Sequence, residues 1–442
     1  MKKNIILITI DSLRTDYLSC YEHHKKTKNI DILAKNGILF KNAFSNGANT
    51  LASVSIMMTS YYLPFITQNT PTLAEVLKKH GYKTVAFNPN VLMLYGFARK
   101  VKITRGFEIY NTLLSSQRKI LEPYIEIGIA QAGKLLELFS LKNKRLFSYL
   151  IKPILYAPLP IDVPCPRADI LTQKSLDWIK RNKDKPFFIW INYMDVHEPY
   201  LPINRYKSLF QKIKMWAINR KLRYFKSAIS LDELNLLKEL YYEELVYVDH
   251  NIGILVDKLQ EYSILDKTVI ILTSDHGEQF MEHGSLAHPN KGLYKEQLHV
   301  PLIIYNYDKN KVLKQKVSLK NIPKTIVEML GINYNGFRGY NILKIESDED
   351  PIISYGGTTN PYISVISGRY KLIIRKIKNK KYYELYDLSS DPAETKNIAN
   401  EHYDVVNLLE NKFIEALTKE KTSISLKNKT LIQIKKIKER MK

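Results

Sequence analysis

Short runs of β-branched and other apolar residues recur along the chain, and segments with helical spacing separate them. Five such runs lie at residues 5–10, 84–87, 187–192, 268–274 and 300–305. Continuous apolar strands that alternate with helices are typical of a parallel sheet covered on both faces. The pattern therefore predicts an α/β fold, with a large, mostly parallel sheet flanked by helices.

Apolar residues spaced by three or four positions predict the helices. The segments that fit are residues 71–80, 168–181 and 232–261, and a further helix is expected at residues 51–60 after a turn at residues 47–49. In the long segment 232–261 this spacing continues to the end, which indicates a packing face.

The pattern changes near residue 350. Residues 363–377 and 381–388, with a turn at residues 378–380, predict a strand pair in a small antiparallel sheet, and a helix is expected at residues 402–419. The basic tail beyond this helix is expected to be frayed. We therefore predict three parts: a catalytic α/β domain at 1–345, a small C-terminal α+β subdomain at 346–420, and a basic tail at 421–442.

Two insertions interrupt the catalytic domain. Residues 111–167 have amphipathic helical character and end in a proline-rich stretch, and residues 203–230 are more basic and contain Trp216, Tyr224 and Phe225. Basic and aromatic residues without a recognised module do not make a nucleic-acid interface, so no nucleic-acid partner is expected. A membrane-surface role and a substrate-lid role both stay open.

Charge indicates the class of partner. The 442 residues include 67 Lys and Arg against 44 Asp and Glu, a formal net charge of +23, although a solvated lysine-rich surface accounts for most of the excess. A basic surface favours anionic partners. We expect an anionic small-molecule, glycan or lipid ester substrate and allow peripheral contact with an acidic membrane surface; the oligomeric state is not determined by the sequence.

The N-terminus and the cysteines bear on the compartment. The apolar run after the first two lysines has six residues before Asp11, shorter than the ~7–15 of a signal peptide, and no run approaches the ~18 of a membrane span. Two cysteines, Cys20 and Cys165, exclude a disulfide framework. A cytoplasmic location is therefore expected.

Polar residues follow three of the predicted strands. Asp11 ends the first, Asp275 and His276 follow residues 268–274, and residues 187–192 run on to His197. Ligands of open α/β sheets bind outside the carboxyl ends of the strands, so these side chains are expected to converge. Two carboxylates and an imidazole suit a divalent cation, with calcium, magnesium, manganese and zinc all open.

The segment SNGANTLASVSIMMTS, residues 45–60, offers several hydroxyl groups. Thr50 is placed at the start of the expected helix, where free backbone N–H groups favour an anion. A metal-bound hydroxyl at this position could attack phosphorus or sulfur. Taken by itself, the local sequence favours a plain N-cap role for Thr50.

Six short segments occur in a characteristic order: ILITIDSLRTDYLSCY; NTLASVSIMMTS; YMDVHEPY; YVDHNIGILVDKL; SDHGEQFMEHG with LYKEQLHVPLIIY; and GRYKLI with YELYDLSSDPAETKNIA. Together they resemble the sulfatase family of the alkaline phosphatase superfamily over nearly the whole chain. The resemblance implies an alkaline phosphatase-like fold, with Asp11, Asp275 and His276 as ligands of one divalent cation. It implies Thr50 as the nucleophile and a further ligand.

The resemblance also implies substrate contacts. His197 would contact the substrate or protonate the leaving group, and His288 or Lys291 would hold the transferred anion. His283 is either a substrate contact or part of a turn. Asn192 is either a substrate contact or a core amide with its hydrogen bonds satisfied.

The nucleophile segment departs from the family pattern. Sulfatases carry C-x-P-S-R or S-x-P-S-R, whose first residue is oxidised to formylglycine, whereas this chain has Thr50-Leu51-Ala52-Ser53-Val54. Asp11 is also followed by Ser12, where sulfatases often have a second aspartate. Threonine has a β-methyl group and cannot give the aldehyde, so no formylglycine is expected unless the register shifts to Ser53. Threonine nucleophiles are found in relatives that transfer phosphoryl groups.

Two hypotheses follow. The first is a metal-dependent hydrolase or transferase of sulfuric or phosphoric esters that uses Thr50, with phosphate favoured and sulfate close behind. The alternative is a catalytically weak or silent sulfatase-like protein that binds anionic glycans or lipid headgroups.

Overall fold

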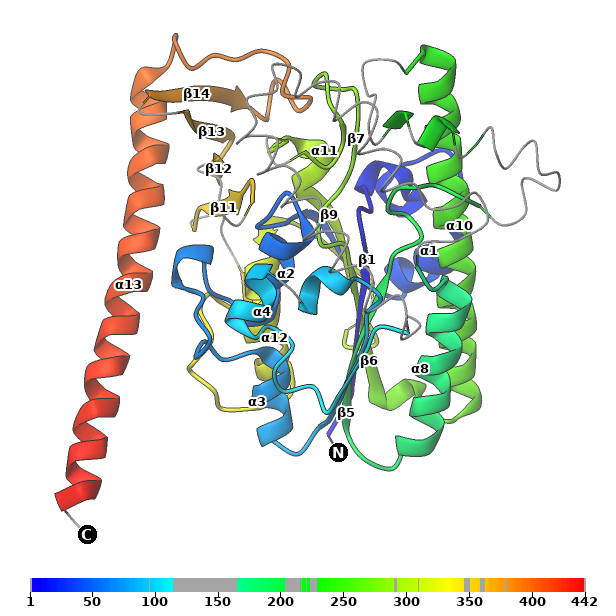
Figure 1. Ribbon diagram of the computed structural model, residues 1–442, viewed down its shortest axis with the longest axis vertical. Coiled ribbons are helices and arrows are strands. Elements are labelled where there is room, and N and C mark those ends of the chain that lie inside the picture. Colours follow the sequence, from blue (N-terminus) through cyan, green and yellow to red (C-terminus); the bar gives the residue numbers. More distant parts are fainter. Residues whose placement is uncertain are drawn as a thin grey trace, which may run out of the picture.

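The computed structural model shows a body centred on one large sheet, with a small sheet and a long C-terminal helix along one side (Figure 1). It describes residues 2–94, 96–113, 165–202, 215, 217–219, 221–222, 229–289, 292–308, 310–345, 350–357, 362–377 and 380–440. Outside these residues lie most of the two predicted insertions, including Trp216, Tyr224 and Phe225. Lys291 lies outside them as well.

The main sheet has eight strands in the order β10-β2-β9-β6-β1-β5-β3-β4. β9 pairs antiparallel with both β6 and β2, and the remaining pairs are parallel. The strands are β1 (Asn4–Ile10), β2 (Gly37–Phe44), β3 (Lys83–Phe87), β4 (Ile109–Asn111), β5 (Phe187–Tyr193), β6 (Thr268–Thr273), β9 (His299–Tyr305) and β10 (Lys311–Ser318). The mostly parallel sheet and its five expected strands are confirmed.

Helices cover both faces of this sheet (Figure 1). One face carries α1 (Lys28–Lys35), α8 (Ala168–Asn182) and α10 (Leu231–Glu261), and the other carries α2 (Thr50–Thr59), α3 (Leu73–Lys79), α4 (Gly96–Val101) and α12 (Ile322–Met329). All seven residues of β1 are buried, because each face of the strand lies against one of two apolar clusters. This burial explains why apolar residues occupy consecutive positions of the central strands rather than only alternate ones.

Short elements complete the main body. They are the single-turn helix α11 (Lys295–Leu298), the strands β7 (Gln279–Phe280) and β8 (Leu286–Ala287), and the 3₁₀ helices η1 (Thr15–Tyr17), η2 (Ser19–Tyr21), η3 (Leu63–Phe65), η4 (Val91–Leu94), η6 (Leu265–Lys267), η7 (Leu319–Asn321) and η8 (Ile342–Lys344). Strands β7 and β8 pair antiparallel beside the main sheet's carboxyl edge.

The C-terminal part contains the predicted antiparallel sheet. Its strands are β11 (Ile352–Tyr355), β12 (Tyr362–Ser367), β13 (Tyr370–Ile377) and β14 (Lys380–Asp387), in that order. The second member of the expected strand pair, residues 381–388, corresponds to β14. The expected single segment 363–377 is wrong, because a turn at Gly368 and Arg369 divides it into β12 and β13, which pair with each other. Of the expected turn, residues 378–379 lie outside the described part of the chain and Lys380 begins β14.

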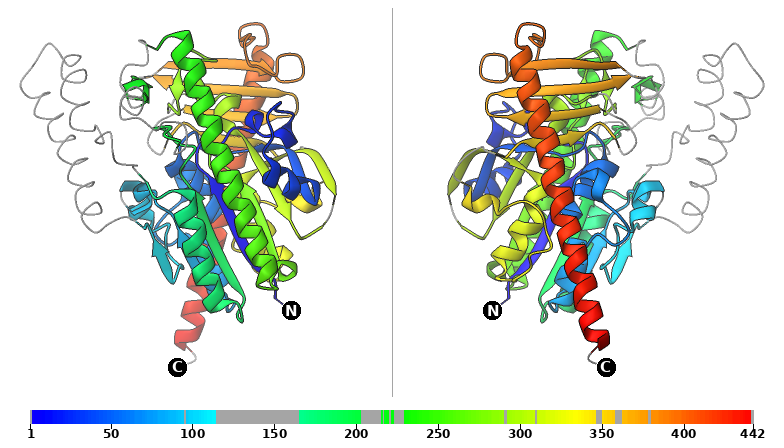
Figure 2. Two further views of the ribbon diagram at one scale, coloured as in Figure 1. Left: turned by 90° about the vertical axis from the view of Figure 1, so that its right-hand side faces the viewer. Right: turned by 90° about the vertical axis from the view of Figure 1, so that its left-hand side faces the viewer.

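The last helix is longer than the sequence indicated. α13 runs from Tyr403 to Arg440, so the predicted end at Lys419 and the predicted frayed tail are both wrong. The physical reason is composition, because the segment is rich in Lys, Leu, Ile and Glu and contains no glycine or proline to end it. Figure 2 shows α13 continuing past the main sheet towards the C-terminus.

Within the described residues, no helix combines the length and the apolar character needed to cross a membrane.

Candidate active site

The polar residues at the ends of β1 and β6 meet in the folded protein. Asp11 follows β1, and Asp275 and His276 follow the neighbouring strand β6. All three side chains are fully buried, and one ligand atom from each lies within 4.8 Å of the others. The convergence expected from the strand ends is therefore found.

The Ser274 hydroxyl connects the ends of β1 and β6, and a tyrosine attaches the segment after β1 to α10. Ser274 Oγ donates to the Ile10 carbonyl (2.7 Å) and accepts from the Leu13 backbone N–H (3.0 Å). The Tyr241 hydroxyl, from α10, donates to the Ser12 carbonyl (2.8 Å) and accepts from the Arg14 N–H (2.9 Å). The Ser274 bonds thus hold the segments that carry Asp11 and Asp275 side by side.

Thr50 is the first residue of α2 and lies against the same group. Its Oγ1 is 3.3 Å from His276 Nε2 and 3.4 Å from Asp11 Oδ2. The helix cap is Asn49, whose side chain accepts from the Ala52 N–H (3.0 Å). The local indication that Thr50 is the N-cap is therefore wrong, because Asn49 occupies the cap and Thr50 points at the carboxylate and imidazole.

The neighbouring hydroxyl Ser53 is engaged elsewhere. It accepts a hydrogen bond from Ser45 Oγ (3.0 Å), and Ser45 also donates to the Asp275 carbonyl. Gly47 allows this close packing, since a Cβ there would lie 2.4 Å from the Ser53 backbone nitrogen. These contacts place Thr50, rather than Ser53, next to Asp11 and His276.

The distances within this group match those between ligands of a common ion. His276 Nε2 lies 3.7 Å from Asp11 Oδ1 and 3.5 Å from Asp275 Oδ2, too far for ordinary hydrogen bonds. Donors about 2.1 Å from a tetrahedral ion lie about 3.4 Å apart, and so do donors at right angles about 2.4 Å from calcium.

Two further observations fit a cation at this point. The backbone N–H groups of Ser12 and His276 donate to Asp275 Oδ1, whereas the buried Oδ2 has no hydrogen-bond partner among the described residues. His276 Nδ1 lies 2.9 Å from the Gly277 carbonyl and donates to it in the matching tautomer, which leaves the Nε2 lone pair facing the carboxylates. Burial, and then the nearby Asp11 carboxylate, raises the pKa of Asp275, a cost that a bound cation would offset.

Asn90 is a neighbour that the sequence reasoning missed. Its Nδ2 donates to Asp11 Oδ2 (3.4 Å), and its backbone N–H donates to Asn88 Oδ1 (2.9 Å). Asn88 directly follows β3 and Asn90 is two residues further on, so a search for polar residues after every strand would have found them. Asn192 is fully buried, accepts from Thr9 Oγ1 (2.5 Å) and donates to Asn88 Oδ1 (3.2 Å), as a satisfied core amide does.

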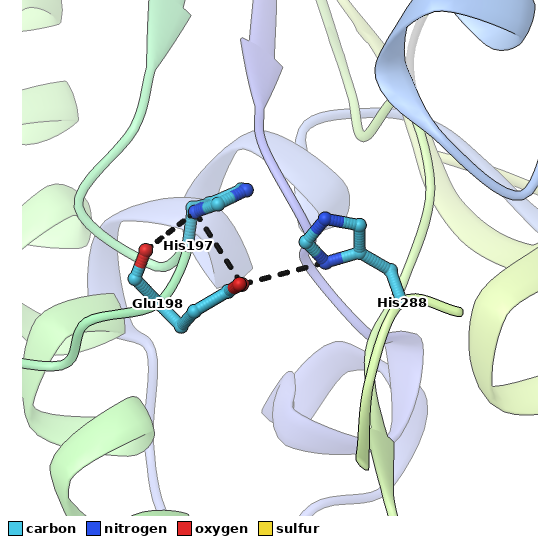
Figure 3. Close-up of side chains that lie close together, drawn as sticks. All are labelled: His197, Glu198 and His288. Carbon is cyan, nitrogen blue, oxygen red and sulfur yellow. Dashed lines mark hydrogen bonds and ion pairs between the residues drawn. The ribbon is translucent and has the colours of Figure 1, made fainter. Parts of the chain in front are cut away.

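Three histidines form a row that begins at His276. The ring of His288 lies 4.8 Å from the ring of His276 and 4.8 Å from the ring of His197. Glu198 lies between the latter two, with its Oε2 3.5 Å from each Nδ1 (Figure 3). Glu278 Oε1 is 3.4 Å from His288 Nδ1.

Glu198 and Glu278 were not predicted as site residues. Each lies close to a residue that was predicted, because Glu198 follows His197 and Glu278 is two residues after His276. Burial by itself lowers the pKa of His288, but these two carboxylates outweigh it and raise the pKa to about 10. The imidazole is thus held as a cation when no other positive charge is present.

His283 lies in a different environment. Its ring stacks on Tyr294 with centroids 3.7 Å apart, and its Nε2 is 3.3 Å from Glu296 Oε2. These contacts are compatible with the turn-shaping alternative for His283.

A cavity of about 520 Å³ lies apart from this cluster, between η7 and α13. Its lining includes Lys320, Arg338 and Glu420 but none of the residues around Thr50. We take the cluster at the strand ends as the candidate site, because polar groups with metal-ligand spacing converge there.

The chain is similar to known proteins over most of its length. The model of the family described as Sulfatase matches residues 3–332. An arylsulfatase of Clostridium perfringens (strain 13 / Type A) is 22% identical, over 90% of this chain and 91% of that protein.

Solved structures show the same fold. The phosphonate monoester hydrolase of Agrobacterium radiobacter gives a TM-score of 0.67 at 20% identity, covering 95% of this chain and 96% of that one. A protein solved in complex with its substrate D-glucosamine-2-N,6-O-disulfate gives 0.66 at 18% identity, covering 95% and 98%.

Proposed function

This chain belongs to the sulfatase family, and from that premise we propose that it cleaves an anionic ester with Thr50 as the nucleophile. The observation that carries the proposal is the position of the Thr50 hydroxyl, 3.3 Å from His276 Nε2 and 3.4 Å from Asp11 Oδ2 at the start of α2. The free N–H groups at this helix start favour the negative charge of a phosphate or sulfate.

Asp11, Asp275 and His276 would hold one divalent cation, with the Thr50 hydroxyl as a further ligand. The unpartnered Asp275 Oδ2 and the ligand-like spacings support this assignment. Such a cation neutralises the charge of an anionic ester and lowers the pKa of a bound hydroxyl. The donor set suits calcium, manganese, magnesium or zinc, and the metal stays open.

The protein groups supply the remaining chemistry. Thr50 donates its hydroxyl proton towards Asp11 Oδ2 and forms a bond to the phosphorus or sulfur, while the bond to the leaving alcohol breaks. His197 gives the departing oxygen a proton and then takes one from the water, or acceptor hydroxyl, that releases the group from Thr50. As that bond breaks, the Thr50 oxygen takes back its proton from Asp11. The Nδ1 of His197 lies 2.7 Å from the Glu198 carbonyl, an arrangement that orients the ring.

The substrate anion would be held by positive charge beside this centre. His288, kept cationic by Glu198 and Glu278, is the nearest candidate, and Lys291 remains a second one. Asn192 would act through Asn88 and Asn90 on Asp11 rather than by direct contact with the substrate. For His283 the contacts with Tyr294 and Glu296 favour a structural role.

A phosphate ester is the favoured substrate class, and a sulfate ester is the second. Threonine has no route to formylglycine, which favours the phosphoryl reaction. The similar proteins include a phosphonate monoester hydrolase and an arylsulfatase, so esters of phosphorus and of sulfur both occur among their named substrates. The substrate is an anionic small molecule, glycan or lipid ester.

The test compares aryl phosphate, aryl phosphodiester and aryl sulfate substrates, each with added Ca²⁺, Mg²⁺, Mn²⁺ or Zn²⁺. We expect metal-dependent turnover that falls at least about 1,000-fold in Thr50→Ala, because a nucleophile is lost. Peptide mass mapping of residues 45–60 should find the trapped phosphoryl or sulfuryl group on Thr50.

The matched control is Ser53→Ala, which removes a hydroxyl three residues away and should keep the adduct on Thr50. Equal turnover in Thr50→Ala and the unaltered protein would contradict the proposal. If the protein neither turns over any ester nor binds a cation, the silent, anion-binding alternative is favoured.

A further inference from the structure

The cavity between η7 and α13 has the size of a small-molecule site. Its volume of about 520 Å³ falls within the ~300–1,000 Å³ that is typical of ligand pockets, and it is far larger than an inorganic anion needs. The lining is contributed by η7, the segment 337–340, the start of β11 and one stretch of α13. Segments far apart in the sequence thus enclose a space that is separate from the one beside Thr50.

Lys320 is a buried cation of this lining. Its Nζ lies 3.1 Å from Glu420 Oε2 and 4.2 Å from the centre of the Tyr62 ring. Glu420 is shared, because its Oε1 also accepts from the Tyr62 backbone N–H (2.8 Å). Burial lowers the pKa of Lys320, and Glu420 offsets this effect only in part. A second negative group beside the ammonium would therefore favour its charged form.

Arg338 and Lys412 add two half-buried cations, and neither forms an ion pair within the described residues. Arg338 Nη1 donates to Ser423 Oγ (2.6 Å), and Lys412 Nζ donates to Ser367 Oγ (2.7 Å). Together with the Lys320–Glu420 pair, these residues give the buried and half-buried lining three cations against one carboxylate. The remaining charged residues of the lining are exposed; they are Asp350, Glu415 and Lys419.

Aromatic rings form another part of the lining. Phe337 and Tyr62 are buried, and Tyr340 is half-buried. A pocket with apolar walls and a few charged groups is typical of a site for an organic molecule rather than for a bare ion. The charges then select an organic molecule that carries an anionic group.

We propose that this cavity binds a small organic phosphate, with the phosphate held by Lys320, Arg338 and Lys412 and the organic part against the aromatic rings. A phosphate monoester carries about 1.5 to 2 negative charges at pH 7, which matches the surplus of cations, whereas a sulfate ester carries a single one. Guanidinium and ammonium groups are the usual protein partners of phosphate. The site is distinct from the ester-cleaving one and does not depend on Thr50 or on a metal.

The test variants are chosen away from the loop that leads to Thr50. Ser318 Oγ and the Lys320 backbone N–H both donate to Asn46 Oδ1 (2.7 and 2.9 Å), so changes at these two positions could move that loop. Arg338 and Lys412 instead bond to Ser423 and Ser367, and they are replaced by glutamine.

The experiment is calorimetric titration of full-length protein that carries Thr50→Ala and is freed of metal, so that no ester is cleaved. The probes are glucose 6-phosphate and adenosine monophosphate, with glucose and adenosine as their uncharged counterparts. We expect at least one phosphate ester to bind and its uncharged counterpart not to bind. Arg338→Gln and Lys412→Gln, each added to this protein, should weaken the binding by about 10-fold or more, because each removes a charged hydrogen-bond donor.

Lys324→Gln is the matched control. Lys324 is a half-buried lysine of the neighbouring helix α12, pairs with Glu328 (3.2 Å) and lies outside the lining, so this variant should bind the ester normally. Lysine acetylation mapped by mass spectrometry gives the location without a variant. The bound ester should protect Lys412 and leave Lys324 unprotected, and circular dichroism checks that every variant is folded.

Three outcomes would overturn the proposal. The first is unchanged affinity in both Arg338→Gln and Lys412→Gln, which means that the ester is held elsewhere on the protein. The second is equal binding of a phosphate ester and its uncharged counterpart. The third is no measurable binding of either ester. Each is obtained without turnover and without metal, so the proposed function of Thr50 is judged separately.

Discussion

At the scale of single residues, a buried ion-pair cluster holds the loop that carries His197. Arg167 donates two hydrogen bonds to Glu244 (2.9 and 2.6 Å), and its Nε lies 3.0 Å from Asp195 Oδ1. Glu244 also accepts from the Leu201 N–H (2.9 Å), so both ends of the loop from Asp195 to Leu201 are attached to the cluster.

We expect Arg167→Met to lower the free energy of unfolding by about 3–5 kcal/mol, because it leaves Glu244 and Asp195 buried without their partner. Urea unfolding followed by circular dichroism measures the change. The double variant Arg167→Met/Glu244→Leu should recover part of the loss, whereas Lys258→Met, at an exposed ion pair with Glu261, should change little. A loss no larger in Arg167→Met than in Lys258→Met would contradict the argument.

His299 gives a pH dependence at the same scale. Burial lowers its pKa to about 4, and its Nε2 lies 2.8 Å from the Lys41 carbonyl. In the unfolded chain the pKa is about 6.5, so between pH 6.5 and 4 the unfolded state binds more protons than the folded state. The contribution of His299 to stability is therefore complete above about pH 6.5 and is lost as the pH falls towards 4.

The measurement is the free energy of unfolding of the unaltered protein and of His299→Gln between pH 7.5 and 4.5. Glutamine can keep the hydrogen bond to the Lys41 carbonyl but does not titrate. The variant should lose less stability than the unaltered protein on acidification. If the free energy of unfolding falls equally in both proteins as the pH is lowered, His299 is not the group that causes the pH dependence.

At the scale of elements, β11 of the small sheet is bonded to the loop that precedes Thr50. Ala48 N–H donates to the Tyr355 carbonyl (2.9 Å), and Tyr355 N–H donates to the Asn46 carbonyl (3.0 Å). Asn46 Nδ2 adds a bond to the Ile353 carbonyl (2.7 Å). The segment predicted as a separate subdomain at 346–420 thus helps to position the start of α2.

Gly47 tests this junction. An alanine Cβ would lie 2.4 Å from Ser53 N and 2.7 Å from Ala52 Cβ, so the loop or the start of α2 must move. We expect Gly47→Ala to cost about 1–3 kcal/mol and to reduce turnover more than substrate binding, because Thr50 is displaced.

Gly331→Ala is the control for this change. Gly331 has a φ of +66°, and an added Cβ would meet nothing within 4 Å, so the substitution should cost about 1 kcal/mol of stability and leave turnover unchanged. Steady-state kinetics and thermal unfolding of both variants provide the comparison. Normal turnover in Gly47→Ala would mean that Thr50 tolerates movement of its loop.

At the scale of the whole molecule, α13 extends past the main sheet (Figure 2). Its packing on the body includes Ile424, and residues 426–442 contain seven basic residues and one glutamate. A basic helical end of this kind is attracted to acidic lipid surfaces by about 1 kcal/mol per basic residue near the surface.

We therefore expect the protein to sediment with vesicles that contain phosphatidylserine and not with purely phosphatidylcholine vesicles, and the binding to weaken as salt rises. A chain ending at Ser425 should lose most of this binding. The variant with the basic residues of 426–442 changed to glutamine keeps the length and should lose it as well. Salt-independent binding to both kinds of vesicle would contradict an electrostatic origin.

The sequence by itself determined the class of fold and the positions of the central strands. Buried parallel strands such as β1 and β5 have apolar runs that include both faces of the strand, a pattern that is readable without knowledge of their neighbours. It also determined that Asp11, Asp275 and His276 stand at strand ends, where a parallel sheet brings side chains together. Three strands of the main sheet, β2, β4 and β10, were missed. The edge strands β4 and β10 are partly exposed and lack the continuous apolar run, and in β2 the run is interrupted by Lys41 and Asn42.

Only the tertiary structure decided which hydroxyl faces the carboxylates and which residues complete the surroundings. Asn49 caps α2 and Ser45 hydrogen-bonds to Ser53, which leaves Thr50 beside Asp11. This position results from contacts that the loop before α2 makes with the end of β6 and with β11. Asn90, Glu198 and Glu278 joined the cluster in the same way. Their distances to Asp11 and His288 depend on strand order, and that order is set by the packing of segments far apart in the sequence.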